Sequence, residues 1–253
     1  MDKDIQKFID FVMESQRICF FGGAGVSTES GVPDFRSKDG LYNQHDVQFD
    51  MYEPEYLLSN DCLVRNPKVF YEYYRQKMDA RHVSPNITHK MLAKLEEMGK
   101  LSGVVTQNID GLHQKAGSRV VYELHGTTLK NYCMTCGFKY SEDYIYDSNE
   151  HIPTCIKCGG RVRPDVTLYQ EGLPEDAVSG AVNCIANADM IIIGGTSLKV
   201  YPAASFIRYF QGKHLAVINK EPLDIQLDPV NDVSIVGSLG DVFKALYEAI
   251  EAN

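Results

Sequence analysis

Residues 18–28 read Ile-Cys-Phe-Phe-Gly-Gly-Ala-Gly-Val-Ser-Thr, and this stretch decides the fold. Four apolar residues predict a short buried strand, and the glycines that follow predict a tight turn into a helix. Backbone amides in such a turn can approach a pyrophosphate closely. The third glycine of G-x-G-x-x-G is absent, because Thr28 stands there. Taken alone, the stretch therefore fits a plain strand-to-helix turn equally well.

Apolar runs of the same kind recur along the chain and alternate with helical stretches. An amphipathic helix is expected at the start, where Ile5, Phe8, Ile9, Val12 and Met13 recur at helical spacing. The alternation predicts an α/β protein, a doubly wound and mostly parallel sheet with helices on both faces. Besides 18–21, buried strands are expected at 103–106, 120–124, 190–194, 215–219 and 233–236.

Two segments break this alternation. Residues 36–85 are polar and aromatic, with helices expected near 54–59 and 67–78, and residues 127–164 carry a cysteine cluster. We interpret both as insertions that together make a smaller second domain. The large domain would then consist of residues 1–35, 86–126 and 165–253.

The cysteine cluster has the spacing C-x2-C-x18-C-x2-C, formed by Cys133, Cys136, Cys155 and Cys158. This spacing is typical of a tetrahedral thiolate zinc site, and glycines after each pair suit the tight turns of such a site. Four thiolates leave no open coordination position, so one structural zinc per chain is expected. The other cysteines, at 19, 62 and 184, stand alone and are expected to be small buried hydrophobes.

The bulk composition narrows the classes of partner. The chain has 253 residues and a net charge of -9, which disfavours nucleic-acid binding but suits a basic peptide. No apolar run approaches the length of a membrane span. Three of the first four residues are charged, and the start of the chain does not look like a signal peptide. We therefore expect a cytoplasmic monomer that binds neither membrane nor nucleic acid.

Polar side chains follow two of the expected strands. Gln107, Asn108 and Asp110 come after the strand at 103–106, and their amide and carboxylate groups can bind ribose hydroxyls or a carboxamide. Helix capping by Asn108 or Asp110 explains them about equally well. His125 ends the strand at 120–124 and suits general-base work near neutral pH. His113 is its rival, but an expected helical position makes it the poorer candidate.

Further turns carry groups that suit a nucleotide. In the loop at 29–36, Phe35 could shield a reactive sugar carbon and Arg36 could pair with a phosphate. The turns at 194–197, 219–221 and 237–242 offer contacts to phosphate, ribose and adenine. Each is an ordinary turn when taken singly. Together they predict a polar edge along one sheet.

With these strings in place, the chain resembles the sirtuin family of NAD-dependent protein lysine deacylases, and a bacterial-type deacetylase in particular. The resemblance implies a Rossmann-like large lobe, with NAD and an acyl-lysine peptide meeting in the cleft between it and a zinc-bearing lobe. It covers nearly the whole chain, in the family's order. The strings that carry it are residues 23–27, 29–36, 106–110, 124–126, 163–166, 195–198 and 200–204, with the four zinc cysteines.

The resemblance also assigns roles to residues. The implied reaction removes acetyl groups from lysine and releases nicotinamide and O-acetyl-ADP-ribose, with His125 and Asn108 as the catalytic residues. The implied peptide contacts are Val166, Leu198, Val200 and Tyr201. The implied contacts to NAD, the co-substrate, are Ala24, Thr28, Phe35, Arg36, Gln107, Asn108, Ile109, Asp110, Gly195, Thr196, Ser197, Asn219, Lys220, Asp241 and Val242.

Three departures from the family pattern bear on specificity. Gly22 stands where threonine is common, and Leu168-Tyr169-Gln170-Glu171 replaces the usual Phe-Gly-Glu. The family branch that removes acidic acyl groups carries Tyr-x-x-Arg, with the arginine three residues after the tyrosine. Here Arg75 lies four residues after Tyr71, which is about 100° further round the helix than the arginine of that branch. Acetyl is therefore favoured over succinyl. The alternatives are a deacylase for succinyl or longer chains, a protein ADP-ribosyltransferase, a dehydrogenase and a zinc-ribbon binding module.

Overall fold

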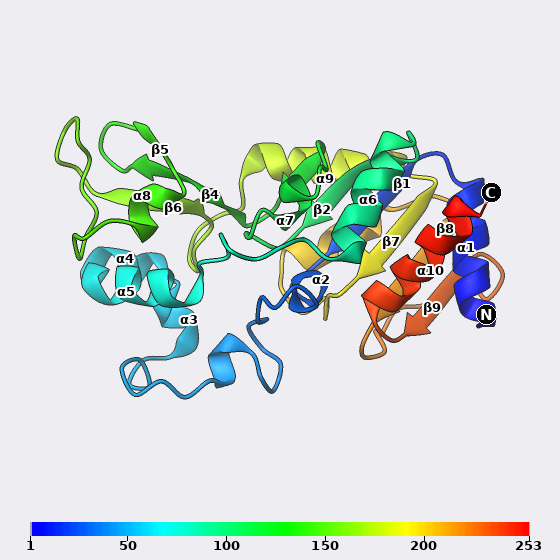
Figure 1. Ribbon diagram of the computed structural model, residues 1–253, viewed down its shortest axis with the longest axis horizontal. Helices are drawn as coiled ribbons and strands as arrows, with labels where there is room; N and C mark the ends of the chain where they lie inside the picture. Colours follow the sequence, from blue (N-terminus) through cyan, green and yellow to red (C-terminus); the bar gives the residue numbers. More distant parts are fainter. Residues whose placement is uncertain (1, 253) are drawn as a thin grey trace.

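The computed structural model describes residues 2–252, and its larger lobe is built on a parallel sheet (Figure 1). The six strands run in the order β3-β2-β1-β7-β8-β9, and every neighbouring pair is parallel. The predicted doubly wound α/β fold is confirmed. The strands are β1 (Ile18–Gly22), β2 (Leu101–Thr106), β3 (Val121–Glu123), β7 (Met190–Gly194), β8 (His214–Asn219) and β9 (Asp232–Val236).

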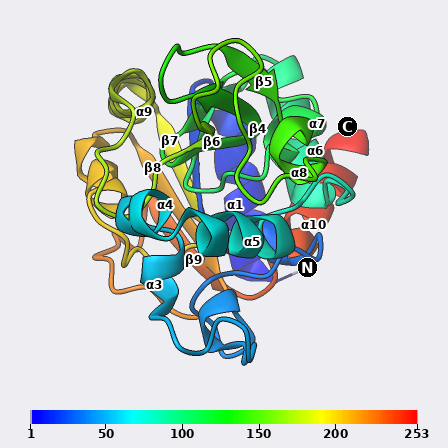
Figure 2. The ribbon, with the colours of Figure 1, turned by 90° about the vertical axis from the view of Figure 1, so that its left-hand side faces the viewer.

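Helices cover both faces of this sheet, as Figure 2 shows. In β1, Ile18 and Phe20 join a core with α1, α6 and α10, whereas Cys19 and Phe21 join another core with α9 and η2. Burial on both faces explains why the strands are continuous apolar runs. The bounds are α1 (Lys3–Glu14), α2 (Gly25–Thr28), α6 (Ile87–Glu97), α7 (Leu112–Lys115), α9 (Glu175–Asn187), α10 (Leu239–Glu251) and the 3-10 helix η2 (Ala203–Tyr209).

Two details of this core differ from the sequence prediction. Met13 was placed on the buried stripe of α1, but it is 38% exposed, and Phe11 is buried instead. The ring of Phe11 stacks on that of His214 in β8, with the centroids 3.8 Å apart. Cys19 and Cys184 are buried as predicted, but they do not stand alone. Their sulfurs lie 3.1 Å apart, across the interface between β1 and α9.

The smaller lobe combines short helices with a three-stranded antiparallel sheet (Figure 1). It has its own hydrophobic core, which draws residues from both predicted insertions. The sheet, α4 and α8 were not foreseen in the sequence. Apart from the eight-residue β4, these elements have six residues or fewer. The bounds are the 3-10 helix η1 (Leu41–Asn43), α3 (Pro54–Leu57), α4 (Asn60–Arg65), α5 (Pro67–Lys77), β4 (Gly126–Cys133), β5 (Lys139–Ser141), α8 (Asp143–Tyr146) and β6 (Val162–Val166).

Within residues 2–252, no helix combines the length and the apolar character that crossing a membrane requires. The first helix, α1, and the last helix, α10, both lie at the side of the large lobe that is remote from the small lobe (Figure 1). The carboxyl ends of β1, β2 and β7 lead into the region between the lobes, and the candidate site is built there.

Candidate functional site

The loops after β1 and β7 meet where the strand order of the sheet reverses, which is where open α/β sheets bind ligands. The Gly25 amide donates to the Gly195 carbonyl at 2.8 Å. A Cβ atom on Gly25 would lie 2.7 Å from the Gly195 Cα, and Gly195 has a φ of +59°. Glycine is therefore required at both positions, because the loops after β1 and β7 pack backbone against backbone there. Since α2 has only four residues, the loop backbone contributes more here than a helix dipole.

Ser27 joins this glycine loop to the loop after β2. Its hydroxyl donates to Asp110 Oδ2 at 2.6 Å and accepts from the side-chain amide of Asn108 at 3.0 Å. In the loop after β2, the side-chain amide of Gln107 donates to the Thr196 hydroxyl at 3.1 Å. The structure thus brings predicted residues from the ends of β2 and β7 together, and Ser27, which was not predicted, joins them from the end of β1. These bonds fix the orientation of the Asn108 and Asp110 side chains relative to the glycine loop.

Both carboxylate oxygens of Asp110 accept hydrogen bonds from within the protein. Its Oδ1 accepts from the amide of Leu112, the first residue of α7, at 2.9 Å, although the N-cap position of that helix is Gly111. Its Oδ2 accepts from Ser27. Burial raises the pKa of Asp110, and these two hydrogen bonds oppose the rise. A carboxyl group with a raised pKa in a polar loop is suited to contact a neutral amide ligand.

His125 follows β3, and one hydrogen bond fixes its ring. Nδ1 lies 2.9 Å from the Gln107 carbonyl oxygen. A carbonyl only accepts, so Nδ1 carries the proton and Nε2 of the neutral ring keeps its lone pair. Burial lowers the pKa of His125 and Arg36 lowers it further, against the hydrogen bond to Gln107. The ring is therefore mostly neutral at pH 7, and Nε2 can accept a proton.

The rival histidine has a different environment. His113 is 1% exposed, and its ring faces that of His89 with the centroids 4.7 Å apart. Neither of its ring nitrogens has a hydrogen-bond partner among the described residues. Burial lowers the pKa of His113 to about 3. Because it is enclosed behind the loop at 107–111, His113 is not placed to touch a substrate.

Phe35 and Arg36 lie in the loop at residues 29–40, between α2 and η1. The Asp34 carboxylate accepts from the Arg36 amide at 3.0 Å, which closes the turn. The Phe35 ring lies 5.4 Å from the Tyr42 ring, and the Arg36 guanidinium lies over the same Tyr42 ring at 5.4 Å. Arg36 also donates to the Tyr169 hydroxyl at 2.9 Å. The two predicted residues are thus held in place by aromatic contacts.

The other predicted NAD contacts lie along the same edge of the large sheet. Asp241 and Val242 lie in the first turn of α10, after β9. Val242 is 2% exposed and its side chain packs in the core, so only its backbone is available to a ligand. At the ends of the remaining strands the structure places Ala24 and Thr28 (β1), Ile109 (β2), Ser197 (β7) and Asn219 and Lys220 (β8).

The predicted peptide contacts lie in two segments. Val166 pairs with Gly126 in the register of β4 and β6, so it lies beside His125. Residues 198–201 follow the Thr196 turn after β7, where the Leu198 amide donates to the Thr196 hydroxyl at 3.2 Å. Tyr201 is 73% exposed. An exposed segment beside a strand end is suited to pair with an extended peptide.

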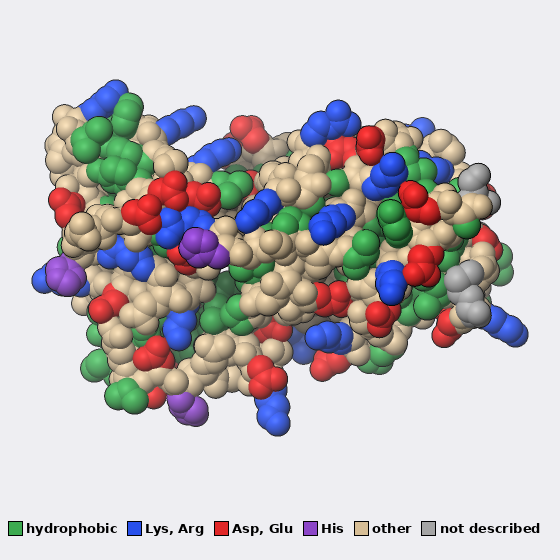
Figure 3. Space-filling model, in the orientation of Figure 1, with side chains coloured by type: hydrophobic (Ala, Val, Ile, Leu, Met, Phe, Trp, Pro, Cys, Tyr) green, Lys and Arg blue, Asp and Glu red, His purple; other side chains and the backbone are tan. Residues whose placement is uncertain are grey.

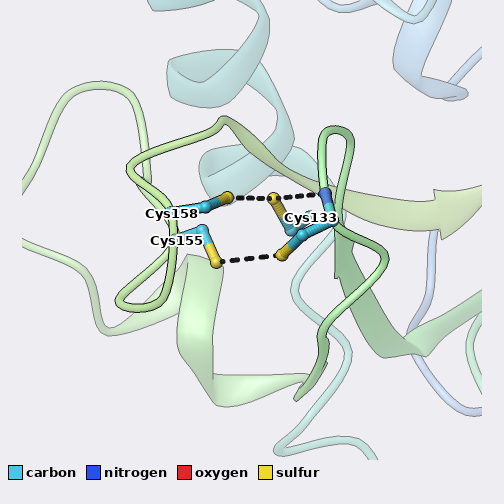
Figure 4. A group of neighbouring side chains, drawn as sticks. Cys133, Cys155 and Cys158 are labelled. Carbon is cyan, nitrogen blue, oxygen red and sulfur yellow. Dashed lines mark hydrogen bonds between the residues drawn. The ribbon is translucent and has the colours of Figure 1, made fainter.

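The four cysteines of the small lobe form a site that fits zinc (Figure 4). Their sulfurs all lie within 4.8 Å of one another, with Cys133 and Cys158 at 3.5 Å and Cys136 and Cys155 at 3.7 Å. A tetrahedral zinc with bonds of about 2.3 Å places its sulfurs about 3.8 Å apart. Backbone amides also point at the sulfurs, as in metal-binding turns; the Thr135 amide lies 3.4 Å from Cys133 Sγ. With all four positions filled by cysteine, the zinc would stabilise the lobe.

The sequence reasoning missed three residues of the site. Ser27 makes the bonds described above, and its hydroxyl in the glycine string was the available signal. The second is Glu171, whose carboxylate pairs with the buried Arg163 through Nη1–Oε1 at 2.5 Å and Nη2–Oε2 at 2.9 Å. The third is Tyr169, which contacts Arg36 although the two are 133 residues apart.

Comparisons with known proteins agree with this geometry. Residues 23–202 match the sequence profile of the Sir2 family. The NAD-dependent protein deacetylase of Clostridium perfringens (strain 13 / Type A) is 50% identical over 244 residues, covering 96% of this chain and 98% of that protein. The protein of the same name from Cutibacterium acnes is 46% identical over 246 residues, covering 97% and 98%.

Solved structures give the same result. A Sir2 protein with a p53 peptide and NAD+ is similar with a TM-score of 0.83 and 33% identity, covering 100% of both chains. A Sir2 protein bound to an acetylated peptide is similar with a TM-score of 0.81 and 32% identity, covering 100% of this chain and 98% of that one.

Proposed function

The chain belongs to the Sir2 family, and on this premise we propose that it removes acetyl groups from lysine side chains of proteins with NAD as co-substrate. The products would be free lysine, nicotinamide and O-acetyl-ADP-ribose. The observation that carries the proposal is the arrangement of His125, whose Nδ1 is engaged by the Gln107 carbonyl while Nε2 is left to accept a proton. The ring follows β3 on the large sheet, whose strand order reverses between β1 and β7.

The residues present fit NAD. The Gly25–Gly195 contact holds the loops after β1 and β7 together, and the backbone amides of these loops would receive the pyrophosphate. Asn108 and Asp110, oriented by Ser27, would receive the carboxamide and the ribose beside it. NAD supplies a sugar carbon from which nicotinamide can leave. The residues would hold that carbon against the acetyl oxygen of the substrate, and Phe35 would exclude water from it.

His125 would act as the general base. In the proposed reaction the acetyl oxygen bonds to the sugar carbon as nicotinamide leaves, and Nε2 would then take a proton from a ribose hydroxyl, which attacks the acetyl carbon. One water would complete the release of free lysine and O-acetyl-ADP-ribose. A lowered pKa keeps the ring neutral and ready at pH 7. Positive charge develops on the sugar as nicotinamide leaves, and the polar loop of Asn108 and Asp110 is suited to stabilise it.

The contacts of Tyr71 and Arg75 support acetyl rather than succinyl as the preferred group. The Tyr71 hydroxyl donates to the Val162 carbonyl at 2.6 Å. The Arg75 guanidinium donates to the carbonyls of Ile145 at 2.8 Å and Glu150 at 2.7 Å. Both side chains are therefore engaged in holding the small lobe together. Neither is free to bind an acyl carboxylate.

We further propose a bacterial-type enzyme that works as a monomer in the cytoplasm and does not bind nucleic acid. The seven cysteines are all free thiols in the structure, and a thiolate zinc site suits a reducing compartment. Acidic and basic side chains are interspersed over the face in Figure 3, without a continuous basic patch, and the net charge is -9. This distribution favours a protein or peptide substrate over a polyanion.

The test is mass spectrometry of the products from acetyl-, succinyl- and longer-chain acyl-lysine peptides incubated with NAD. The proposal expects the fastest release of free lysine from the acetyl peptide. Faster turnover of another acyl peptide would refute the acetyl preference. Labelled NAD that ends on protein, with no free lysine formed, would instead identify an ADP-ribosyltransferase, and growth of NADH absorbance would identify a dehydrogenase.

A further inference from the structure

Tyr169 connects two loops of the cleft through its hydroxyl group. The hydroxyl accepts from Arg36 Nη2 at 2.9 Å and lies 2.8 Å from the Tyr42 hydroxyl. The guanidinium of Arg36 is also stacked over the Tyr42 ring. Arg36 is otherwise exposed, so these two tyrosines supply the side-chain contacts that restrain its head group. The tyrosine lies in the stretch that departs from the family pattern.

The backbone that carries Tyr169 is well anchored. Its amide donates to the Leu58 carbonyl at 3.0 Å, and its carbonyl accepts from the Asn60 amide at 3.1 Å, which fastens it to the helices α3 and α4. Two residues later, Glu171 forms the ion pair with Arg163, whose side chain is 7% exposed. Glu171 also accepts from the Leu168 amide at 2.9 Å. The hydroxyl is therefore presented from a rigid segment.

We propose that Tyr169 is a positioning residue for NAD: its hydroxyl holds the Arg36 guanidinium in the orientation that receives the co-substrate. The inference rests on the proposed function, because Arg36 is assigned to NAD there. An exposed arginine samples many rotamers, and a neutral acceptor on a fixed loop limits them without neutralising the charge. Tyr169 would act through Arg36 and would not itself touch the reacting atoms.

The experiment compares zinc-loaded full-length wild type with Tyr169→Phe, Arg36→Ala and the double variant. Tyr169→Phe keeps the ring and removes only the hydroxyl. We expect it to raise the KM for NAD about five-fold, the effect of one hydrogen bond, with kcat changed less than two-fold. In the Arg36→Ala background the same change should have no further effect. Tyr209→Phe, at a tyrosine that is 51% exposed, is the matched control and should behave as wild type.

Calorimetric titration of NAD into the same proteins separates this inference from the proposed function. If wild type binds NAD but does not deacetylate, the proposed function fails, and the binding constants still test Tyr169. An NAD affinity unchanged in Tyr169→Phe would overturn the inference. A loss of equal size in the Arg36→Ala background would also overturn it, because the hydroxyl would then act independently of Arg36.

Discussion

The buried pair His89 and His113 should make stability depend strongly on pH. His89 lies in α6 and His113 in α7, and both are at most 1% exposed. Burial lowers the pKa of His89 to about 4, and burial together with the neighbouring His89 lowers that of His113 to about 3. Both rings therefore stay neutral in the folded protein over the pH range in which an exposed histidine becomes charged.

The sign and size follow from proton linkage. A histidine in the unfolded chain has a pKa of about 6.5, so below this pH the unfolded state binds protons that the folded state refuses. Stability is thus present above pH 6.5 and is lost as the pH falls. Between pH 7 and pH 5 the loss is about 2 kcal/mol for each histidine, or about 4 kcal/mol for the pair.

The variant His113→Leu isolates one of the two contributions. It removes a titrating ring whose two nitrogens are unpaired among the described residues. Urea unfolding at pH 7 and pH 5, followed by circular dichroism, gives the free energy of unfolding of each protein. Zinc release and other titrations affect wild type and variant alike, so they cancel in the difference between the two pH dependences.

We expect the variant to lose about 2 kcal/mol less than wild type over this interval. His45→Gln, at an imidazole whose side chain is 97% exposed, is the control and should keep the full wild-type dependence. Equal pH dependence in wild type and His113→Leu would refute the reasoning, because it would mean that His113 is protonated in the folded protein or is not enclosed.

Three further predictions concern the cleft and the zinc site. His125→Ala should lower deacetylation at least about 10²-fold while melting and zinc content stay normal, and near-normal turnover would show that another group is the base. Gly25→Ala places a Cβ 2.7 Å from the Gly195 Cα. It should push the loops after β1 and β7 apart, cost about 1–3 kcal/mol of stability in urea unfolding and weaken NAD binding about ten-fold or more in calorimetry. Unchanged stability would contradict the close packing of the two loops, and unchanged NAD affinity would contradict their assignment to NAD. Cys133→Ser should release zinc and lower the melting temperature, and any loss of activity should follow from this loss of stability. A metal-free variant that melts like wild type would exclude a structural role for the zinc.

The large sheet could be predicted from the sequence because its central strands, β1 and β7 above all, are buried on both faces and read as uninterrupted apolar runs. The zinc site was equally predictable from the sequence, since the four ligands are close in sequence and their spacing is restricted. Short elements could not be predicted in this way. The helix α4 has six residues and β5 has three, too few for a periodic pattern.

The contacts within the site were the least predictable part. Ser27 and Asp110 are 83 residues apart, and Arg36 and Tyr169 are 133 apart, so the strand order brings them together. A sequence shows which residues carry hydroxyl or amide groups, but it does not show which of them meet. The same reason explains Met13: helical spacing placed it on the buried stripe, and the extent of the surface that covers α1 decided otherwise.

The most direct test of the account is the stoichiometry of the reaction. Purified protein is incubated with an acetyl-lysine peptide and NAD, and every product is quantified by mass spectrometry. We expect equal amounts of free-lysine peptide, nicotinamide and O-acetyl-ADP-ribose, one of each for every NAD consumed. Acetate released without loss of NAD, or NAD left intact with every acylated peptide offered, would contradict the account.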